Sequence, residues 1–171
     1  MKKMAILFTL IFISTGLHAG DPLDSAKLVS FLPKADVDGF SRIVFDAMSP
    51  VGRMTSAMVQ YIKMPSNQKG KAEIISVSIS IMDGLLYRDS IDRQIAPRSK
   101  NDEAVTVKGK YKGIRNNKDS GPETKRAMVS WIVGGRFLLS IHADGSNDFL
   151  FIQKFIDLVD LSGLEAVSET R

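Results

Sequence analysis

The stretch KRAMVSWIVGGRFLLSIHADG, residues 125–145, decides the fold of this 171-residue chain. Two apolar segments rich in β-branched residues meet at Gly134-Gly135, and glycine readily adopts the positive φ angles that a two-residue hairpin turn requires. We therefore expect residues 126–133 to pair with residues 136–143 as a β-hairpin. Asp144-Gly145 is a turn signal that ends the second strand.

Alternation of apolar and polar residues predicts further strands before this hairpin. Residues 71–82 give the clearest case, because isoleucines and a valine fall on one face and three serines fall on the other. Residues 54–63 alternate in the same way, and Arg42 to Phe45 can begin another strand. One face of the resulting sheet is therefore expected to be buried, and the other to be small and polar.

Apolar residues at helical spacing predict three helices, over residues 23–32, 83–95 and 148–161. Ser146 or Asn147 is expected to cap the last helix. The broad apolar stripe of that helix comprises Leu150, Phe151, Ile152, Phe155, Ile156, Leu158 and Val159. Because such a stripe needs a whole sheet face to cover, we predict one α+β domain, in which a single antiparallel β-sheet is packed by helices.

The first 19 residues have the organisation of a secretory signal peptide. Two lysines form a positive start, residues 4–16 are apolar, and the small residue Ala19 precedes the expected cleavage site. A retained membrane anchor is the alternative, but the apolar stretch is shorter than the roughly 20 residues of a spanning helix. We therefore expect export to the periplasm, or secretion, and a mature domain over residues 20–171 that is not an integral membrane protein.

The composition of the mature chain argues against several classes of function. Its 23 basic residues fall to 21 once the two signal-peptide lysines leave, against 19 acidic residues, so the net charge is only +2. This near balance argues against a nucleic-acid partner. The chain has no cysteine, and His142 is the only histidine left after cleavage, so we expect no transition-metal site and no cofactor.

His142 is the main candidate for catalysis. A nucleophile–histidine–carboxylate relay can be drawn with Ser140, or with a serine distant in sequence, and with Asp144 as the orienting carboxylate. However, Ser140 lies within an expected strand and lacks the sharp turn that exposes a nucleophile. We therefore predict no catalytic residue and no enzymatic activity.

Two groups of carboxylates invite other interpretations. The stretch DGSND, residues 144–148, lacks the alternating ligands and closing glutamate of a calcium loop, and a strand-to-helix turn explains it better. Asp83, Asp89 and Asp92 lie along the second expected helix, where solvated surface charge is the simpler interpretation than a paired acid and base. We predict neither kind of site.

The most distinctive polar feature is a run of basic residues. Interpreted as a single strand, residues 105–116 carry Lys108, Lys110 and Lys112 on one face. Lysines that protect a sheet edge from aggregation are one interpretation. The other is a docking surface for an acidic partner or an anionic lipid headgroup, formed by Lys108, Lys110, Tyr111, Lys112 and Arg115. Because Tyr111 is the only aromatic residue among them, single-stranded nucleic acid is disfavoured.

Several phrases resemble a group of small, largely uncharacterised exported bacterial proteins. They are FLPKADVDGF (31–40), ISVSISIMDGLLY (75–87) and VGGRFLLSIHADG (133–145), followed by FIQKFIDLVDLSGL (151–164). The group shares a Leu-Pro…Gly-aromatic opening. The strand–turn–strand–helix ending is also similar to the PsbP/Mog1-type α/β/α sandwich, whose members act as assembly factors, partner-binding subunits or chaperone-like adaptors. The resemblance implies a non-catalytic role, although a fold alone does not define a function.

These observations predict a non-catalytic periplasmic accessory or binding protein that acts through protein–protein contact. The alternative is a small-molecule or lipid-binding protein with a pocket between the sheet and the C-terminal helix, because the apolar stripe of that helix is so broad. An enzyme that uses His142 is the third hypothesis.

Overall fold

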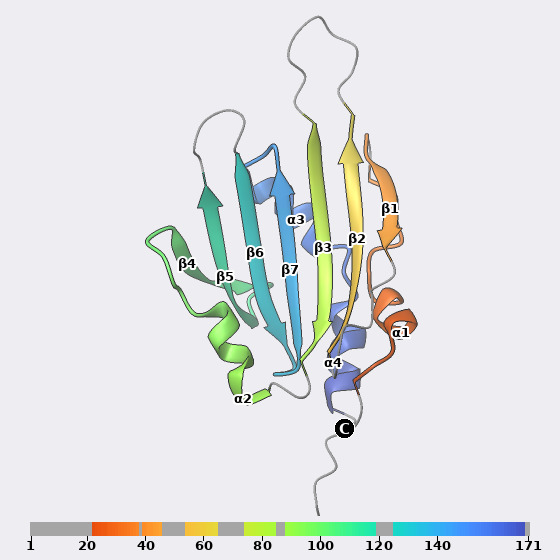
Figure 1. Ribbon diagram of the computed structural model, residues 1–171, viewed down its shortest axis with the longest axis vertical. Helices are drawn as coiled ribbons and strands as arrows, with labels where there is room; N and C mark the ends of the chain where they lie inside the picture. The colour runs from red at the N-terminus through yellow and green to blue at the C-terminus, as the bar shows by residue number, and fades with distance from the viewer. Residues whose placement is uncertain are drawn as a thin grey trace, which may run out of the picture.

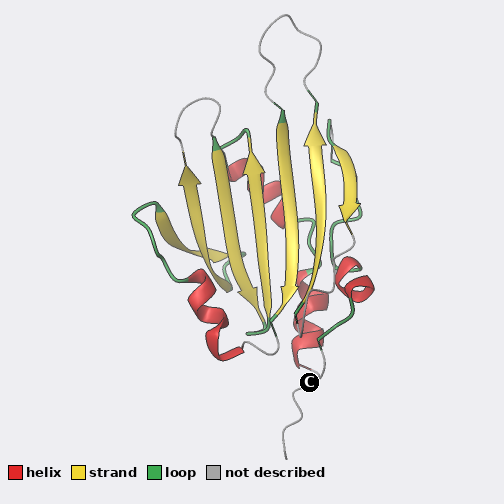
Figure 2. Cartoon of the chain, in the orientation of Figure 1, coloured by secondary structure: helices red, strands yellow, loops and turns green. Residues whose placement is uncertain are grey.

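The computed structural model describes residues 22–37, 39–45, 54–64, 74–84, 88–118 and 125–169. The expected signal peptide, residues 1–19, lies outside the described residues. The described chain forms one seven-stranded antiparallel sheet with helices packed on it, as Figures 1 and 2 show. This arrangement confirms the α+β class that the sequence predicts.

The sheet joins two runs of consecutive strands. The strands are β1 (Ser41–Phe45), β2 (Thr55–Lys63), β3 (Ile75–Asp83), β4 (Asp102–Val107), β5 (Tyr111–Lys118), β6 (Arg126–Val133) and β7 (Phe137–Asp144). Their order across the sheet is β1-β2-β3-β7-β6-β5-β4, and every neighbouring pair is antiparallel. The pairing of β3 with β7 holds the two runs together, and β1 and β4 are the edge strands.

The helices divide the sheet into two unlike faces. Three helices contact β2, β6 and β7 from one side, here called the helix face. They are α1 (Ser25–Val29), α3 (Phe149–Ile156) and α4 (Leu161–Glu169). The short helix α2 (Arg88–Ile91) continues into the 3-10 helix η2 (Asp92–Ile95), which contacts β5 and β6. Figure 1 shows α2 in front of the sheet and α3 and α4 behind it. The front side is called the second face below.

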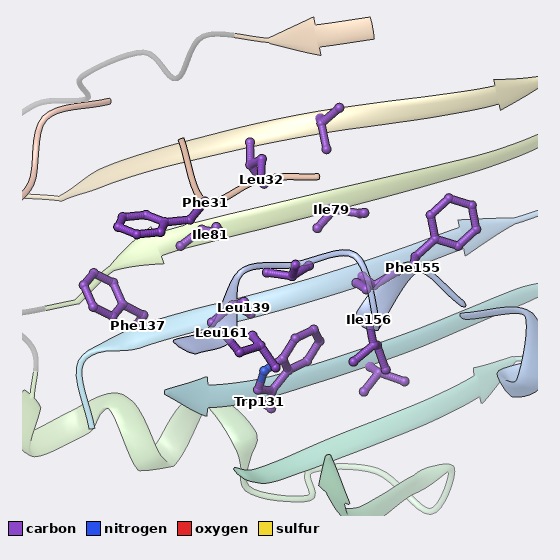
Figure 3. Close-up of a cluster of buried hydrophobic side chains, with 14 of the residues drawn as sticks. Phe31, Leu32, Ile79, Ile81, Trp131, Phe137, Leu139, Phe155, Ile156 and Leu161 are labelled. Atoms are coloured by element: carbon purple, nitrogen blue, oxygen red, sulfur yellow. The ribbon is translucent and has the colours of Figure 1, made fainter. Parts of the chain in front are cut away.

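The core lies between the helix face and its helices. The predicted alternation in β3 is confirmed, since Val77, Ile79 and Ile81 are fully buried while the serines between them are only half-buried. Trp131 of β6 and Phe155 of α3 are also fully buried, and Figure 3 shows both with the aliphatic side chains of the central strands. Burial of apolar side chains on this scale is the main source of stability in a chain without disulfides.

The last helix differs from its prediction. Asp148, not Ser146 or Asn147, is the N-cap, because its carboxylate accepts a hydrogen bond from Leu150 N at 2.8 Å. The expected helix 148–161 ends earlier, at Ile156, and a separate helix, α4, begins at Leu161. Asp160 accepts a hydrogen bond from Gly163 N at 2.9 Å at the start of α4. Leu150, expected in the buried stripe, is 80% exposed.

A buried ion pair corrects the prediction for Asp83. This residue is not a solvated helix charge but the last residue of β3, and its side chain is fully buried. Arg136 Nε and Nη2 donate to its two carboxylate oxygens at 2.9 and 2.5 Å, and Leu23 N donates to Oδ2 at 2.8 Å. The pair therefore ties the β6–β7 turn and the segment before α1 to the end of β3. Asp92 is exposed on η2 as expected, and the side chain of Asp89 lies outside the described residues.

Candidate functional site

The predicted lysine strand is a hairpin. The chain turns at Lys108 and Gly109, whose φ angles are +52° and +68°, and Lys110 N donates to Val107 O at 3.1 Å. The expectation of one strand over residues 105–116 is therefore wrong. Because the turn reverses the chain, Lys108, Lys110 and Lys112 do not share one face.

Four of the five predicted docking residues nevertheless lie on the same side of the molecule. Lys108 and Lys110 extend from the turn toward α3 and α4, where they meet Asp157 and Glu165. Tyr111 and Arg115 lie on the helix face, in register with Val107 and Glu103 of β4. The exception is Lys112, which pairs with Thr106 and lies on the second face.

A groove opens on the helix face where β4 and β5 extend past α3. We call it the β4 groove. It encloses about 340 Å³. The lining residues are Glu103, Val105, Thr106, Val107, Arg115, Val129, Phe149, Gln153 and Ile156. Five of the nine lining residues are aliphatic or aromatic and four are polar or charged, and the Arg115 guanidinium lies 4.9 Å from the centre of the Phe149 ring. The β4 groove lies between the sheet and the first C-terminal helix.

Three ion pairs lie along the β4 groove and the adjacent turn. Arg115 Nη2 lies 2.7 Å from Glu103 Oε2, and Lys108 and Lys110 pair with Asp157 and Glu165. The contact with Lys108 lowers the pKa of Asp157, and the contact with Glu165 raises the pKa of Lys110. In each pair at least one side chain is exposed, so each pair is weak. The cations are thus not a bare basic surface but part of a mixed-charge rim.

The acidic partners and Phe149 were not identified from the sequence. Asp157 follows the last residue of α3 and Glu165 lies in α4, about 50 residues after the turn that they contact. Only the folded chain brings them together with Lys108 and Lys110. Glu103 was not identified either, although a usable signal existed, since its alternation with Val105 and Val107 places all three on one face.

A second cavity lies on the opposite face of the same strand. It encloses about 540 Å³ beneath η2. The lining residues are Asp92, Ile95, Ala104, Val105, Thr106, Lys112 and Gly113. Lys112 therefore faces this second cavity and not the β4 groove. The edge strand β4 has a hollow on each side.

His142 lies on the second face, away from both cavities. It is exposed between Ser78 of β3 and Met128 of β6. Packing around its ring lowers its pKa by desolvation, while the charge of Asp144 opposes that shift. Asp144 is bound to Arg126 at 2.7 Å, and Ser140 Oγ lies 2.8 Å from Ser130 Oγ. Among the described residues no hydrogen bond joins His142 to Ser140 or Asp144, so the considered relay is not assembled.

Within the described ranges, no group of three or more histidine, aspartate or glutamate side chains is arranged to hold a metal ion. None of the helices in the described part of the chain is long and apolar enough to cross a membrane. No protein-family model, curated protein or solved structure matches this chain significantly.

Proposed function

We propose that this protein is a non-catalytic accessory protein that acts in the periplasm by binding another protein through the β4 groove. The observation that carries the proposal is a hollow at the edge of the sheet whose walls combine apolar side chains with charged and polar ones. Protein–protein interfaces likewise combine apolar and polar surface.

The ion pairs support this choice of surface. Exposed pairs add little to folding stability, so Lys108 and Lys110 can exchange their intramolecular carboxylates for those of a partner at small cost. Such charges affect the rate and specificity of association more than affinity. Partly exposed apolar side chains such as Val105 and Phe149 would supply the affinity.

The test is crosslinking of the epitope-tagged protein in its own cells, followed by affinity purification and mass spectrometry. We expect one dominant protein partner, whose recovery falls sharply when Val105→Asp places a charge in the β4 groove or when Lys108→Glu and Lys110→Glu reverse its rim. Lys34→Glu is the matched control. It changes an exposed lysine next to Ala35, whose carbonyl accepts a hydrogen bond from Tyr61 of β2, near the opposite edge of the sheet. Equal recovery from all variants would contradict the proposal.

The volume of the β4 groove favours one second candidate, a small apolar ligand in the same place. Ligand pockets commonly enclose about 300–1,000 Å³, and the groove is at the lower end of that range. Native mass spectrometry of protein purified from its own cells would then show an additional mass that Val105→Asp removes. A bare protein mass would leave only the protein-binding proposal.

A further inference from the structure

The edge strand β4 offers an unpaired backbone beside two hollows. β4 is hydrogen-bonded to β5 on one side, and over the described residues no other strand pairs with it (Figure 1). Glu103, Ala104 and Thr106 are exposed along it. An accessible edge of this kind can bind an extended segment of another protein as an additional strand.

We propose that the partner binds by strand addition, with an extended acidic segment that pairs with the free edge of β4. This inference rests on the proposed protein-binding function and specifies its geometry. Successive side chains of a strand point to opposite faces, and neighbouring strands lie about 4.8 Å apart. An added strand would therefore direct alternate side chains toward the β4 groove and toward the second cavity. Hollows of about 340 and 540 Å³ on the two sides of one edge strand fit that alternation.

The charges beside the second cavity select an acidic segment. Arg93, Arg98, Lys100 and Lys112 are exposed around the start of β4 and its second face. Of the three carboxylates described in the same region, Asp92, Asp102 and Glu103, the last is paired with Arg115. Asp102 is already engaged, since it accepts hydrogen bonds from Arg98 N and Ser99 N at 2.7 and 2.8 Å. With Asn116 as a further donor, these bonds lower its pKa to about 2. The surplus of positive charge attracts a carboxylate-bearing strand.

The same charge argues against a second copy of this chain as the added strand. Two copies paired through β4 would bring two such cationic clusters together, which is unfavourable. The opposite edge strand, β1, provides an internal comparison. It exposes Ile43 and Val44, each at 41%, and thus has an accessible apolar edge.

The experiment is site-specific photo-crosslinking in the cells that make the protein. The photoreactive residue p-benzoylphenylalanine replaces Glu103, Ala104 or Thr106 in the full chain, and Ile43 in the control. We expect crosslinks from the three β4 positions to map to one short continuous segment of the partner that contains Asp or Glu. The attachment point should move along that segment in step with the position in β4.

A charge variant tests the acidic character separately. Lys112 lies across from Thr106 in the β4–β5 register, so Lys112→Glu should reduce the Thr106 crosslink about tenfold, which corresponds to about 1.4 kcal/mol. Lys112→Arg should preserve it, and thermal unfolding of both variants checks that they fold. An equal yield of the Thr106 crosslink in Lys112→Glu and Lys112→Arg would overturn the inference that the added segment is acidic.

The outcomes separate this inference from the proposed function. A partner that depends on the β4 groove but whose β4 crosslinks scatter over distant segments would overturn strand addition alone. Crosslinks to a second copy of the chain, or only from Ile43, would also overturn it. If no crosslink forms and the groove variants recover the same proteins as the unmodified chain, both proposals fail.

Discussion

Two hairpins in this molecule have nearly the same turn, but they place its basic residue in opposite environments. The β4–β5 turn is VKGKY, residues 107–111, and the β6–β7 turn is VGGRF, residues 133–137. In each, two successive residues have positive φ and the fourth residue of the stretch donates its N–H to the carbonyl of the valine at 3.1 Å. The strand register places both turns at the same end of the sheet.

The two turns differ in the burial of the basic residue at the fourth position of each stretch. The side chain of Lys110 is 62% exposed and pairs with Glu165, whereas that of Arg136 is 0% exposed and pairs with Asp83. The central position of β7 brings Arg136 against β3, while β5 is next to the sheet edge. The same local turn therefore supports the core in one hairpin and a solvated rim in the other.

Removal of the buried cation should have the largest effect. Arg136→Met leaves the carboxylate of Asp83 without its charged partner inside the protein, and we expect a loss of about 3–5 kcal/mol in the free energy of unfolding. Denaturant titration measures this loss. If the loss in the free energy of unfolding were smaller than that of an ordinary surface substitution, the buried Arg136 would stabilise the fold no more than the exposed Lys110.

A double variant separates charge burial from packing. In Asp83→Leu with Arg136→Met neither charge remains, so most of the lost stability should return. Recovery should be incomplete, because Leu23 N loses the acceptor it has at 2.8 Å. If the double variant were less stable than Arg136→Met alone, the loss in Arg136→Met would not come from an uncompensated buried charge.

Gly134 is the second residue of its stretch, and Lys108 occupies the same position in the other turn. A Cβ at Gly134 would collide with the Oγ and Cβ atoms of Ser168 in α4, and its φ is +58°. The strain and the collision together should make Gly134→Ala cost about 2–4 kcal/mol. Thermal and denaturant unfolding check this, and Ser168→Gly in the same background should remove the part due to the collision.

Gly109 and Gly135 provide the matched pair. Both have positive φ, at +68° and +61°, and a Cβ at either would meet no atom within 4 Å. Alanine at each should therefore cost only the backbone strain, about 1–2 kcal/mol, and the two costs should be equal. Unequal losses in parallel unfolding experiments would show that the turns differ in more than their surroundings.

The comparison also explains which features the sequence could predict. Gly-Gly between two apolar runs identified the β6–β7 hairpin, and serine alternation identified the buried face of β3, because both signals are local. The β4–β5 turn was missed because Lys108 occupies one of its two positive-φ positions, and a lysine at positive φ is uncommon. A usable signal existed, because residues 107–111 repeat the valine–X–glycine–basic–aromatic order of residues 133–137.

The features that could not be predicted depend on contacts between distant segments. Asp83 continues the alternation of Ile79 and Ile81, so its face was readable, but its partner Arg136 is 53 residues away. The sequence instead suggested that Asp83 begins the expected helix 83–95. The β4 groove likewise takes its walls from β4, β5, β6 and α3, and no local pattern specifies how these elements meet.

The smallest effect on stability is expected at Lys110, the exposed cation of the β4–β5 turn. Lys110→Gln should change stability little at pH 7, because its pair with Glu165 is solvated and is screened by salt. The contact with Glu165 raises the pKa of Lys110 above 10.5, so the small contribution of the pair is complete below that pH. It is lost as the pH rises through the higher pKa of the folded state. Unfolding curves of the variant and the original chain should therefore differ slightly at pH 7 and low salt, and converge in strong alkali. A loss at pH 7 as large as that of Arg136→Met would mean that an exposed hairpin cation stabilises the fold as strongly as a buried one.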